Sequence, residues 1–150
     1  MKTIVQRVTR GQVVVADRVV GAIDRGAVLL VGIEADDTLA DADATAEKIA
    51  KMRFFPGATP MDRTLGDVGG GCLVISQFTL AANLRKGNRP SFARAMDPEP
   101  ADAIYRAVVG RLDALGIETA TGEFGATMQV ELVNDGPVTF LVQSVDGRIQ

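Results

Sequence analysis

Three short segments of the chain carry residue types that could do chemistry. The first is "SQFTL", residues 76–80, in which Ser76, Gln77 and Thr79 follow a long apolar run. Polar side chains at the end of a buried strand are held on a rigid element, as a binding or catalytic site requires. A threonine hydroxyl is a poor nucleophile without a base, and the chain contains no histidine. The segment predicts either groups that line a pocket or a plain strand end whose hydroxyls bond the backbone.

The second segment is "RKGNRPSF", residues 85–92, which combines Arg85, Lys86 and Arg89 with glycine and proline. It lies in a window, residues 68–96, that holds four cationic residues and no Asp or Glu, although the whole chain has a net charge of −3. Arginine side chains bind phosphate groups in a bidentate manner. The window indicates either a local docking site for a polyanion or an ordinary solvated loop.

The third segment is "NDGP", residues 134–137, which separates two apolar runs near the C-terminus. All four residue types favour turns, so a hairpin turn is one interpretation. Short hairpins, however, prefer Asn-Gly or Asp-Gly with the strand resuming at once, whereas here Pro137 follows Gly136. The alternative is that a Gly-Pro unit is presented to a ligand.

The residues that are missing restrict the chemistry. The absence of histidine excludes a Ser-His-Asp triad, a Cys-His dyad and His-ligated zinc. The single cysteine, Cys72, excludes an internal disulfide and a cysteine metal cluster, and we expect it to be a buried structural thiol. There is no tryptophan and one tyrosine, so any base-stacking platform would have to use phenylalanine. We expect neither a metal nor a cofactor.

Length and hydrophobicity indicate the class of protein. The chain has 150 residues, of which 47% are hydrophobic, as is typical of one compact domain. No segment approaches the roughly 20 apolar residues that a membrane span needs, and the N-terminal "MKTIVQRVTRGQ" alternates as a strand does rather than as a signal peptide does. We expect a soluble, cytoplasmic protein with no membrane partner.

The elements that must position the three segments are strands and two helices. Apolar patterns predict strands over 3–10, 12–17, 19–23, 27–34, 72–80, 117–133 and 138–145. In the strand over 72–80, alternation places Gln77 and Thr79 on one face and Ser76 and Phe78 on the other. The order of strands, helix, strand, helix and strands predicts an α+β domain with an antiparallel or mixed sheet.

Apolar residues spaced three and four apart predict the two helices. The first is capped within residues 36–38, ends near Phe55, and buries one face made of Leu39, Ala42, Ala46, Ile49 and Met52. The second begins at Asp97 and Pro98, ends at Gly116, and carries a stripe of Ala101, Ile104, Tyr105, Val108, Leu112 and Leu115. Residues 56–71 and 81–96 are predicted to be loops.

Several motifs in order resemble one family. "SQFTL", then "RPSF", then "VNDGPVTF", with "QRV" at 6–8 and the flanking "TGEFGATMQVELV", are similar to the D-aminoacyl-tRNA deacylases, also called D-tyrosyl-tRNA deacylases. The resemblance covers residues 1 to about 143 and leaves 144–150 as an expected tail. It implies one compact α+β domain with a barrel-like sheet, two main helices, and a homodimer with its active sites at the subunit boundary.

The resemblance also implies a reaction. The substrate would be the ester between a D-amino acid and the 3′ end of tRNA, with glycine on the wrong tRNA as a further substrate. Ser76, Gln77, Phe78 and Thr79 would line the pocket for the aminoacylated adenosine, and Arg85, Lys86 and Arg89 would contact tRNA. Gly136 and Pro137, beside Asn134, would project into the partner subunit's pocket with a cis peptide bond, and Arg7 matches the position that holds that unit in place.

The resemblance suggests a mechanism with little side-chain acid–base work. The Gly-Pro carbonyl groups would bind the substrate amino group and leave no room for an L side chain, while glycine would pass. The terminal 2′-hydroxyl of the tRNA would position or activate water, and backbone N–H groups near Phe78 and Thr79 would stabilise the oxyanion. The alternative mechanism uses Thr79 as a direct nucleophile. It ranks lower because the sequence offers no evident base to activate the hydroxyl.

The sequence departs from the family pattern at one place, and three alternative hypotheses for its function remain. Family members usually carry a Gly-Lys-Met-Asn-like stretch after the first helix, where this chain has Pro60, Met61 and Asp62. The rivals are a general esterase that uses Thr79, a non-catalytic RNA-binding module on the same fold, and a relative with a trans Gly-Pro bond that tolerates a small L-residue. We expect no DNA partner.

Overall fold

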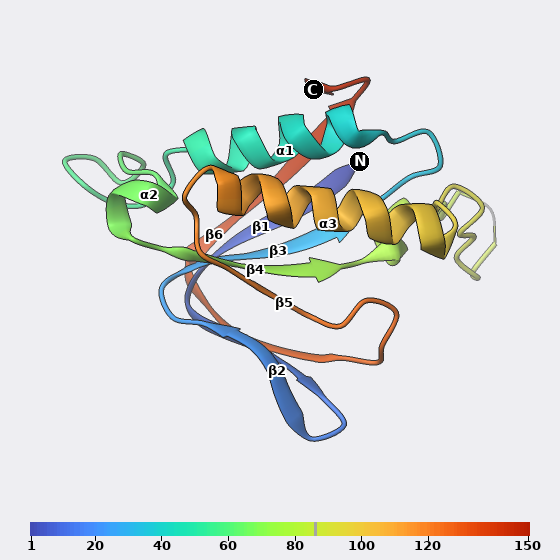
Figure 1. Cartoon of the computed structure of the whole chain (residues 1–150), viewed down its shortest axis with the longest axis horizontal. Coiled ribbons are helices and arrows are strands. Elements are labelled where there is room, and N and C mark those ends of the chain that lie inside the picture. The colour runs from blue at the N-terminus through green and yellow to red at the C-terminus, as the bar shows by residue number, and fades with distance from the viewer. Residues whose placement is uncertain (86) are drawn as a thin grey trace.

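The β-strands form one curled sheet, and two long helices cover one of its faces (Figure 1). The computed structural model describes residues 1–85 and 87–150. Within that part of the chain, the sheet has seven strands in the order β5-β4-β3-β1-β6-β7, with β2 paired to β1. The strands are β1 (Lys2–Val15), β2 (Arg18–Ile23), β3 (Gly26–Gly32), β4 (Gly71–Ser76), β5 (Thr119–Thr121), β6 (Gln129–Val145) and β7 (Arg148–Ile149).

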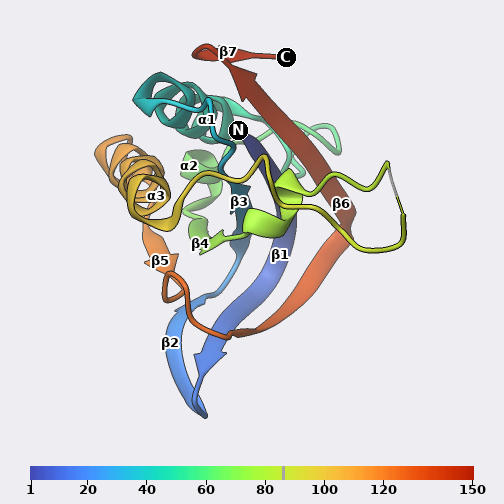
Figure 2. The ribbon, with the colours of Figure 1, turned by 90° about the vertical axis from the view of Figure 1, so that its right-hand side faces the viewer.

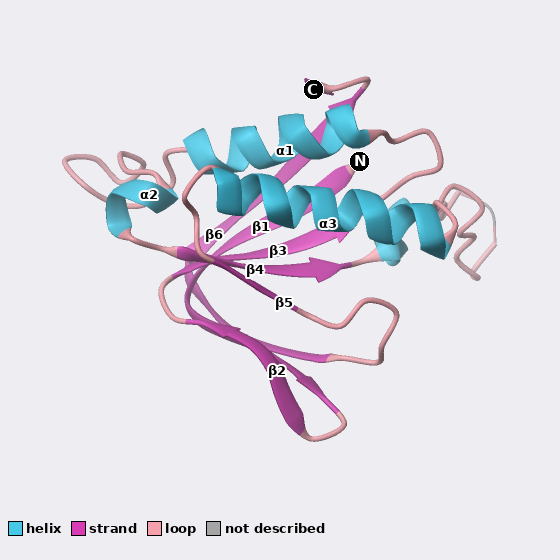
Figure 3. Ribbon diagram, in the orientation of Figure 1, coloured by secondary structure: helices cyan, strands magenta, loops and turns pink. Residues whose placement is uncertain are grey.

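The helices are unequal in length and lie on the same side of the sheet (Figure 3). The described residues form α1 (Leu39–Lys51), α2 (Leu65–Val68), α3 (Pro98–Ala114) and a single 3₁₀ turn, η1 (Phe78–Ala81). The predicted α+β class, with two main helices on a mixed sheet, is confirmed. Strands β3, β4 and β5 are parallel to one another, so α1 and α3 serve as the crossover connections that parallel neighbours require.

Strand β1 is the central strand of the sheet, and three other strands pair with it. Its first half pairs with β3, its second half with β2, and β6 pairs with it over almost its whole length. The prediction of two separate strands over 3–10 and 12–17 is therefore wrong. Gly11, which lies between the two predicted strands, is a buried strand residue that pairs with both Ile23 and Leu132.

The sheet curls until β2 approaches β5 without forming a ladder with it, as the view in Figure 2 shows. A Cβ atom on Gly21 would lie 2.2 Å from the carbonyl oxygen of Thr121, so only glycine permits this approach. The barrel-like sheet that was predicted is thus a half-barrel.

The two long helices agree with their predicted faces except at the ends of α1. This helix ends at Lys51 rather than near Phe55, and Leu39 is 60% exposed instead of buried. The chain leaves the helix after Lys51, and Phe54 and Phe55 are both fully buried in the larger core, with their ring centroids 4.6 Å apart. The predicted start of α3 at Asp97 and Pro98 is confirmed, and Gly116 follows it with a φ of 81°.

Apolar residues pack on both faces of the sheet. The larger core lies under α1 and α3, and a smaller cluster on the opposite face contains Val8, Val13, Val28, Leu73 and Ile75. Cys72 is fully buried, and this burial raises the pKa of its thiol to about 12. The prediction of an inert structural cysteine is confirmed. No helix among the described residues has both the length and the apolar character to cross a membrane.

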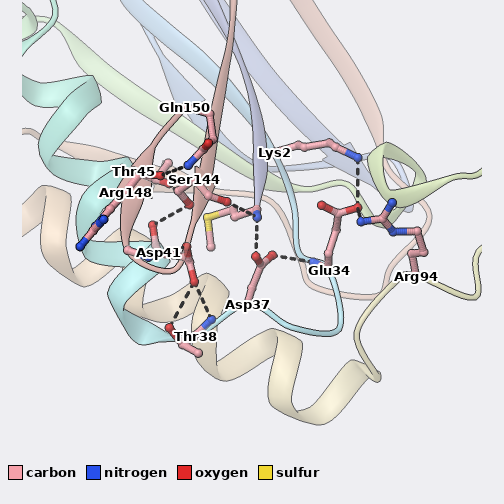
Figure 4. Close-up of polar contacts among 12 residues, drawn as sticks. Lys2, Glu34, Asp37, Thr38, Asp41, Thr45, Arg94, Ser144, Arg148 and Gln150 are labelled. Atoms are coloured by element: carbon pink, nitrogen blue, oxygen red, sulfur yellow. Dashed lines mark hydrogen bonds and ion pairs between the residues drawn. The ribbon is translucent and has the colours of Figure 1, made fainter.

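Residues 144–150, expected as a tail, pack against α1. Ser144 is buried and accepts a hydrogen bond from Thr45 at 3.2 Å, and β7 pairs with the end of β6. The amide of Gly147 donates to the carboxylate of Asp41 at 3.0 Å, and Thr38 donates to the same carboxylate (Figure 4). The segment is therefore a closing hairpin of the fold.

Candidate active site

The "SQFTL" segment begins at the end of β4 and continues as a 3₁₀ turn. Strand β4 stops at Ser76, and the amide of Leu80 then donates to the carbonyl of Gln77 at 3.1 Å. The predicted strand through residue 80 is therefore wrong, and so is the alternation of side chains that was expected for it. Instead, the turn leaves Phe78 56% exposed and holds Thr79 at the surface.

An apolar pocket of about 480 Å³ opens beside this turn. Four parts of the chain line it: the residue that follows β3, the end of β4 with η1, the approach to α3 with its first turn, and the connection from β5 into the start of β6. The lining includes Ser76, Gln77, Phe78, Met96, Phe124 and Met128. Parallel pairing of β4 between β3 and β5 brings these distant segments to one edge of the sheet.

The described residues that line the pocket offer hydrogen-bonding groups but no acid or base. Among the described residues that line it, none is ionisable. The side-chain amide of Gln77 donates to the hydroxyl of Thr79 at 2.6 Å, so this hydroxyl is held by an amide and not by a proton acceptor. This contact does not activate Thr79 as a nucleophile, because an amide is not a base.

The Gly-Pro unit lies within β6 as a bulge. Gln6 pairs with Thr139 and Val8 pairs with Asn134, so Arg7 alone faces residues 135–138. The peptide bond between Gly136 and Pro137 is cis, and both residues are exposed. A hairpin turn between two strands, the plainer interpretation, is wrong because β6 runs through the segment and pairs with β1 on both sides of it.

Arg7 and Asn134 clamp this Gly-Pro bulge, residues 135–137. The Arg7 Nε donates to the carbonyl oxygen of Asp135 at 2.9 Å, and Arg7 Nη1 donates to the carbonyl oxygen of Phe54 at 2.7 Å. The amide of Asn134 donates to the carbonyl oxygens of Arg7 at 2.9 Å and of Val138 at 3.1 Å. Both ends of the bulge are thereby tied to β1, and one end is also tied to the segment after α1.

Gly136 is required by the backbone of the bulge. Its φ is 154°, and a Cβ atom there would lie 2.4 Å from the amide nitrogen of Val138. A side chain at this position would force the bulge to change shape.

Within one chain, the pocket and the bulge lie level with opposite ends of β3. Asn134 is level with Val8 and Gly26, at the start of β3, whereas Ser76 is level with Val31, near its end. Five residues of extended strand separate these levels by about 16 Å. The structure brings Ser76, Gln77 and Phe78 together, and it brings Arg7, Asn134, Gly136 and Pro137 together, but it does not join the two groups.

The basic segment forms part of an exposed connection between η1 and α3. Arg85 and Arg89 are exposed, and Lys86 lies outside the described residues. Asn83 and Ser91 bridge across the connection. A cationic hollow of about 460 Å³ is lined by Arg85, by Arg94 and by Lys2 from β1.

Two kinds of functional candidate were not among the predicted site residues. Lys2 enters the cationic hollow only because β1 passes beneath the connection, and Glu34 holds both Lys2 at 3.0 Å and Arg94 at 3.5 Å (Figure 4). Phe124 and Met128 reach the apolar pocket from the connection between β5 and β6, where the prediction of one strand over 117–133 is wrong. The divergent residues Pro60, Met61 and Asp62 lie in a separate loop, where Asp62 accepts a hydrogen bond from the amide of Ala58 at 2.8 Å.

Comparison with known proteins gives consistent matches. A family model described as D-Tyr-tRNA(Tyr) deacylase matches residues 4–143. The chain is 50% identical over 145 residues to the D-aminoacyl-tRNA deacylase of Anaeromyxobacter dehalogenans, covering 96% of this chain and 97% of that one. It is also 50% identical over 145 residues to the protein of the same name from Halalkalibacterium halodurans, covering 96% and 99%.

Solved structures agree with these matches. A structure described as c-Myc DNA Unwinding Element Binding Protein superposes with a TM-score of 0.90 at 37% identity, covering 97% of this chain and 99% of that chain. A probable eukaryotic D-amino acid tRNA deacylase superposes with a TM-score of 0.81 over 93% of this chain and 97% of that chain, and at 15% identity this likeness concerns the fold alone.

Proposed function

The chain belongs to the D-Tyr-tRNA(Tyr) deacylase family and is a D-aminoacyl-tRNA deacylase, a hydrolase of the aminoacyl ester bond; from this premise we propose how its residues select and cleave the substrate. The apolar pocket beside η1 receives the terminal adenosine with its amino acid. The Gly-Pro bulge excludes L-amino acids. The enzyme works in the cytoplasm and removes D-amino acids, and glycine from the wrong tRNA, before they reach translation.

The active site is completed by a second copy of the chain. The observation that carries this proposal is the separation of the pocket and the bulge, which lie about 16 Å apart along the sheet of one chain. Both are exposed, and the bulge is clamped too firmly to swing across. In a two-fold dimer, the partner subunit's Pro137 enters the pocket of the first subunit, and the reverse contact forms the second site.

Selection works by exclusion. Carbonyl oxygens of the bulge accept hydrogen bonds from the substrate's α-ammonium group, and the rigid backbone leaves no volume where an L side chain would point. A D side chain points away from the bulge, and glycine has no side chain to reject. Rejecting a competitor by a steric clash needs a fixed shape more than it needs many contacts.

Cleavage depends on the substrate's own ribose. The ionisable groups that a side-chain mechanism would need are missing from the described lining of the pocket, so the 2′-hydroxyl of the terminal adenosine positions the attacking water. The amides of Phe78 and Thr79 are the first N–H groups of η1, which have no partner within the turn. They stabilise the oxyanion that develops on the ester carbonyl.

The required ribose also favours tRNA over DNA as the partner. One structural relative is named for binding a DNA unwinding element, but DNA lacks the 2′-hydroxyl that the proposed reaction uses. Arg85, Lys86 and Arg89 supply phosphate contacts that give affinity without sequence readout.

Release of labelled tyrosine from tRNA tests the function. We expect the purified protein, in catalytic amounts, to release D-tyrosine and to leave L-tyrosyl-tRNA intact. Release of both would identify a non-selective esterase, and release of neither by a folded protein would favour a binding module.

A further inference from the structure

Two exposed phenylalanine rings meet at the rim of the apolar pocket. Phe78 is 56% exposed and Phe92 is 39% exposed. Their ring centroids are 5.0 Å apart with an interplanar angle of 65°. Phe78 lines the pocket, whereas Phe92 does not, so the pair extends from the pocket towards the basic connection. Exposed apolar rings gathered beside a pocket mark a contact surface.

We propose that this pair is a stacking platform for the base of the penultimate nucleotide in the unpaired 3′ end of the tRNA. The inference rests on the proposed function, which places the terminal adenosine in the pocket. The nucleotide before it must then leave the pocket across the rim, where the Phe78–Phe92 pair lies. Every base has a π-face, so such a platform accepts any nucleotide at this position.

The charge around the platform favours a nucleic acid as its occupant. Ser91, the neighbour of Phe92, bridges to Asn83, which lines the cationic hollow with Lys2, Arg85 and Arg94. Glu34 neutralises part of this charge through its contacts with Lys2 and Arg94. The sequence around the other cations of the connection, such as the exposed Arg89, contains no Asp or Glu from residue 68 to residue 96. Aromatic rings beside a cationic track are the combination that binds single-stranded RNA.

The platform is held in position before any ligand arrives. The amide of Ala95 donates to the carbonyl of Phe92 at 2.9 Å, and Ala95 bridges to Glu34, two residues beyond the end of β3. Phe78 opens the 3₁₀ turn that follows β4 directly. Both rings are therefore carried by backbone tied to the sheet, so little ordering is required on binding.

The test compares two substrates that differ by the penultimate nucleotide. One is D-tyrosyl-tRNA, and the other is D-tyrosine esterified to adenosine alone. We expect Phe92→Leu to raise KM for the tRNA substrate by about 5- to 150-fold, the range for loss of one stacked base, and to leave kcat/KM for the adenosine ester unchanged. Phe92→Tyr, which keeps the ring, has the wild-type KM for the tRNA substrate. Val145→Ala, at another exposed apolar position, is the control. It leaves KM and kcat/KM unchanged for both substrates.

Three results would overturn the inference. An equal loss of kcat/KM on both substrates would mean that Phe92 supports the pocket itself. No loss on either would remove its role in binding. A change of oligomeric mass in Phe92→Leu would make the pair an interface between copies of the chain.

A binding measurement separates this inference from the proposed function. The trinucleotide CpCpA, titrated against the protein with fluorescence detection, needs no catalysis. If the wild-type protein released no amino acid but Phe92→Leu still weakened CpCpA binding by the same factor, the platform would stand and the proposed reaction would fall. Equal binding by both proteins would overturn the platform alone.

Discussion

We expect Arg7→Lys to weaken both the fold and the selection against L-amino acids. The guanidinium of Arg7 donates at 2.9 Å to Asp135 and at 2.7 Å to Phe54, and the side chain is only 10% exposed. A lysine ammonium keeps the charge but lacks the planar fork that reaches two acceptors at once. Losing one charge-assisted hydrogen bond lowers the free energy of unfolding by about 1.5–3 kcal/mol, measurable by urea denaturation.

The same variant tests the exclusion of L-amino acids. A looser bulge admits an L side chain, so the ratio of kcat/KM for D-tyrosyl-tRNA over L-tyrosyl-tRNA falls by about tenfold or more, since each 1.4 kcal/mol corresponds to a factor of about ten. Thr45→Val is the matched control, because it removes a buried hydrogen bond to Ser144 on the side of α1 and leaves the bulge untouched. An Arg7→Lys protein that lost stability but kept the wild-type ratio would show that the clamp supports only the fold.

Thr79→Ala retains activity within about tenfold of the wild type in steady-state release of D-tyrosine, because the described partner of the hydroxyl is the side-chain amide of Gln77, which is not a base. Complete loss in a folded protein would restore the nucleophile hypothesis. The pH–rate profile contains no imidazole step near about pH 6.5, since the chain has no histidine, and a step at that pH would contradict a mechanism without side-chain bases. Burial raises the pKa of Cys72 to about 12, from 9.0, and that of Tyr105 to about 12, from 10.0. Their contribution to stability is therefore complete below pH 9 and is lost as the pH rises from about 9 towards 12; urea denaturation over this range measures it, and an unchanged stability would contradict the buried state of both groups.

The elements with a strong local pattern could be predicted from the sequence. The stripe on α3 follows helical spacing, and Pro98 and Gly116 mark its two ends through their own backbone preferences. The apolar run of β4 and the α+β order of elements were equally clear. These features depend on neighbours in the chain, which a sequence displays directly.

Features that depend on tertiary contact were predicted incorrectly. Asn-Asp-Gly-Pro has the composition of a turn, but pairing with β1 on both sides keeps it within β6. "SQFTL" reads as a strand, but the sheet edge ends at Ser76 and the chain closes a 3₁₀ turn instead. In both cases partners far along the chain decide the backbone conformation.

The candidate site was predicted in part. Its motifs were identified by resemblance, and Arg7 was placed with the Gly-Pro unit, whose preceding residue Asp135 accepts its hydrogen bond. Phe92 and Lys2 were not singled out as site residues, because their positions follow from how the connection before α3 folds over β1 and η1. That arrangement has no local signature.

Mixed dimers test most directly whether the active site is shared between subunits. One chain carries Ala126→Trp, which fills the apolar pocket and releases no amino acid. The other carries Pro137→Ala, which relaxes the filter so that D- and L-tyrosine are both released. In a mixed dimer, the open pocket of the second chain faces the intact bulge of the first.

The measured quantity is the ratio of D- to L-tyrosine release as the inactive chain is added in excess and the subunits exchange. A site shared across the interface predicts that L release falls towards zero while D release persists, so the ratio rises towards the wild-type value. A site contained in one subunit predicts that both rates per active chain stay unchanged. A constant ratio in proven mixed dimers would contradict the account.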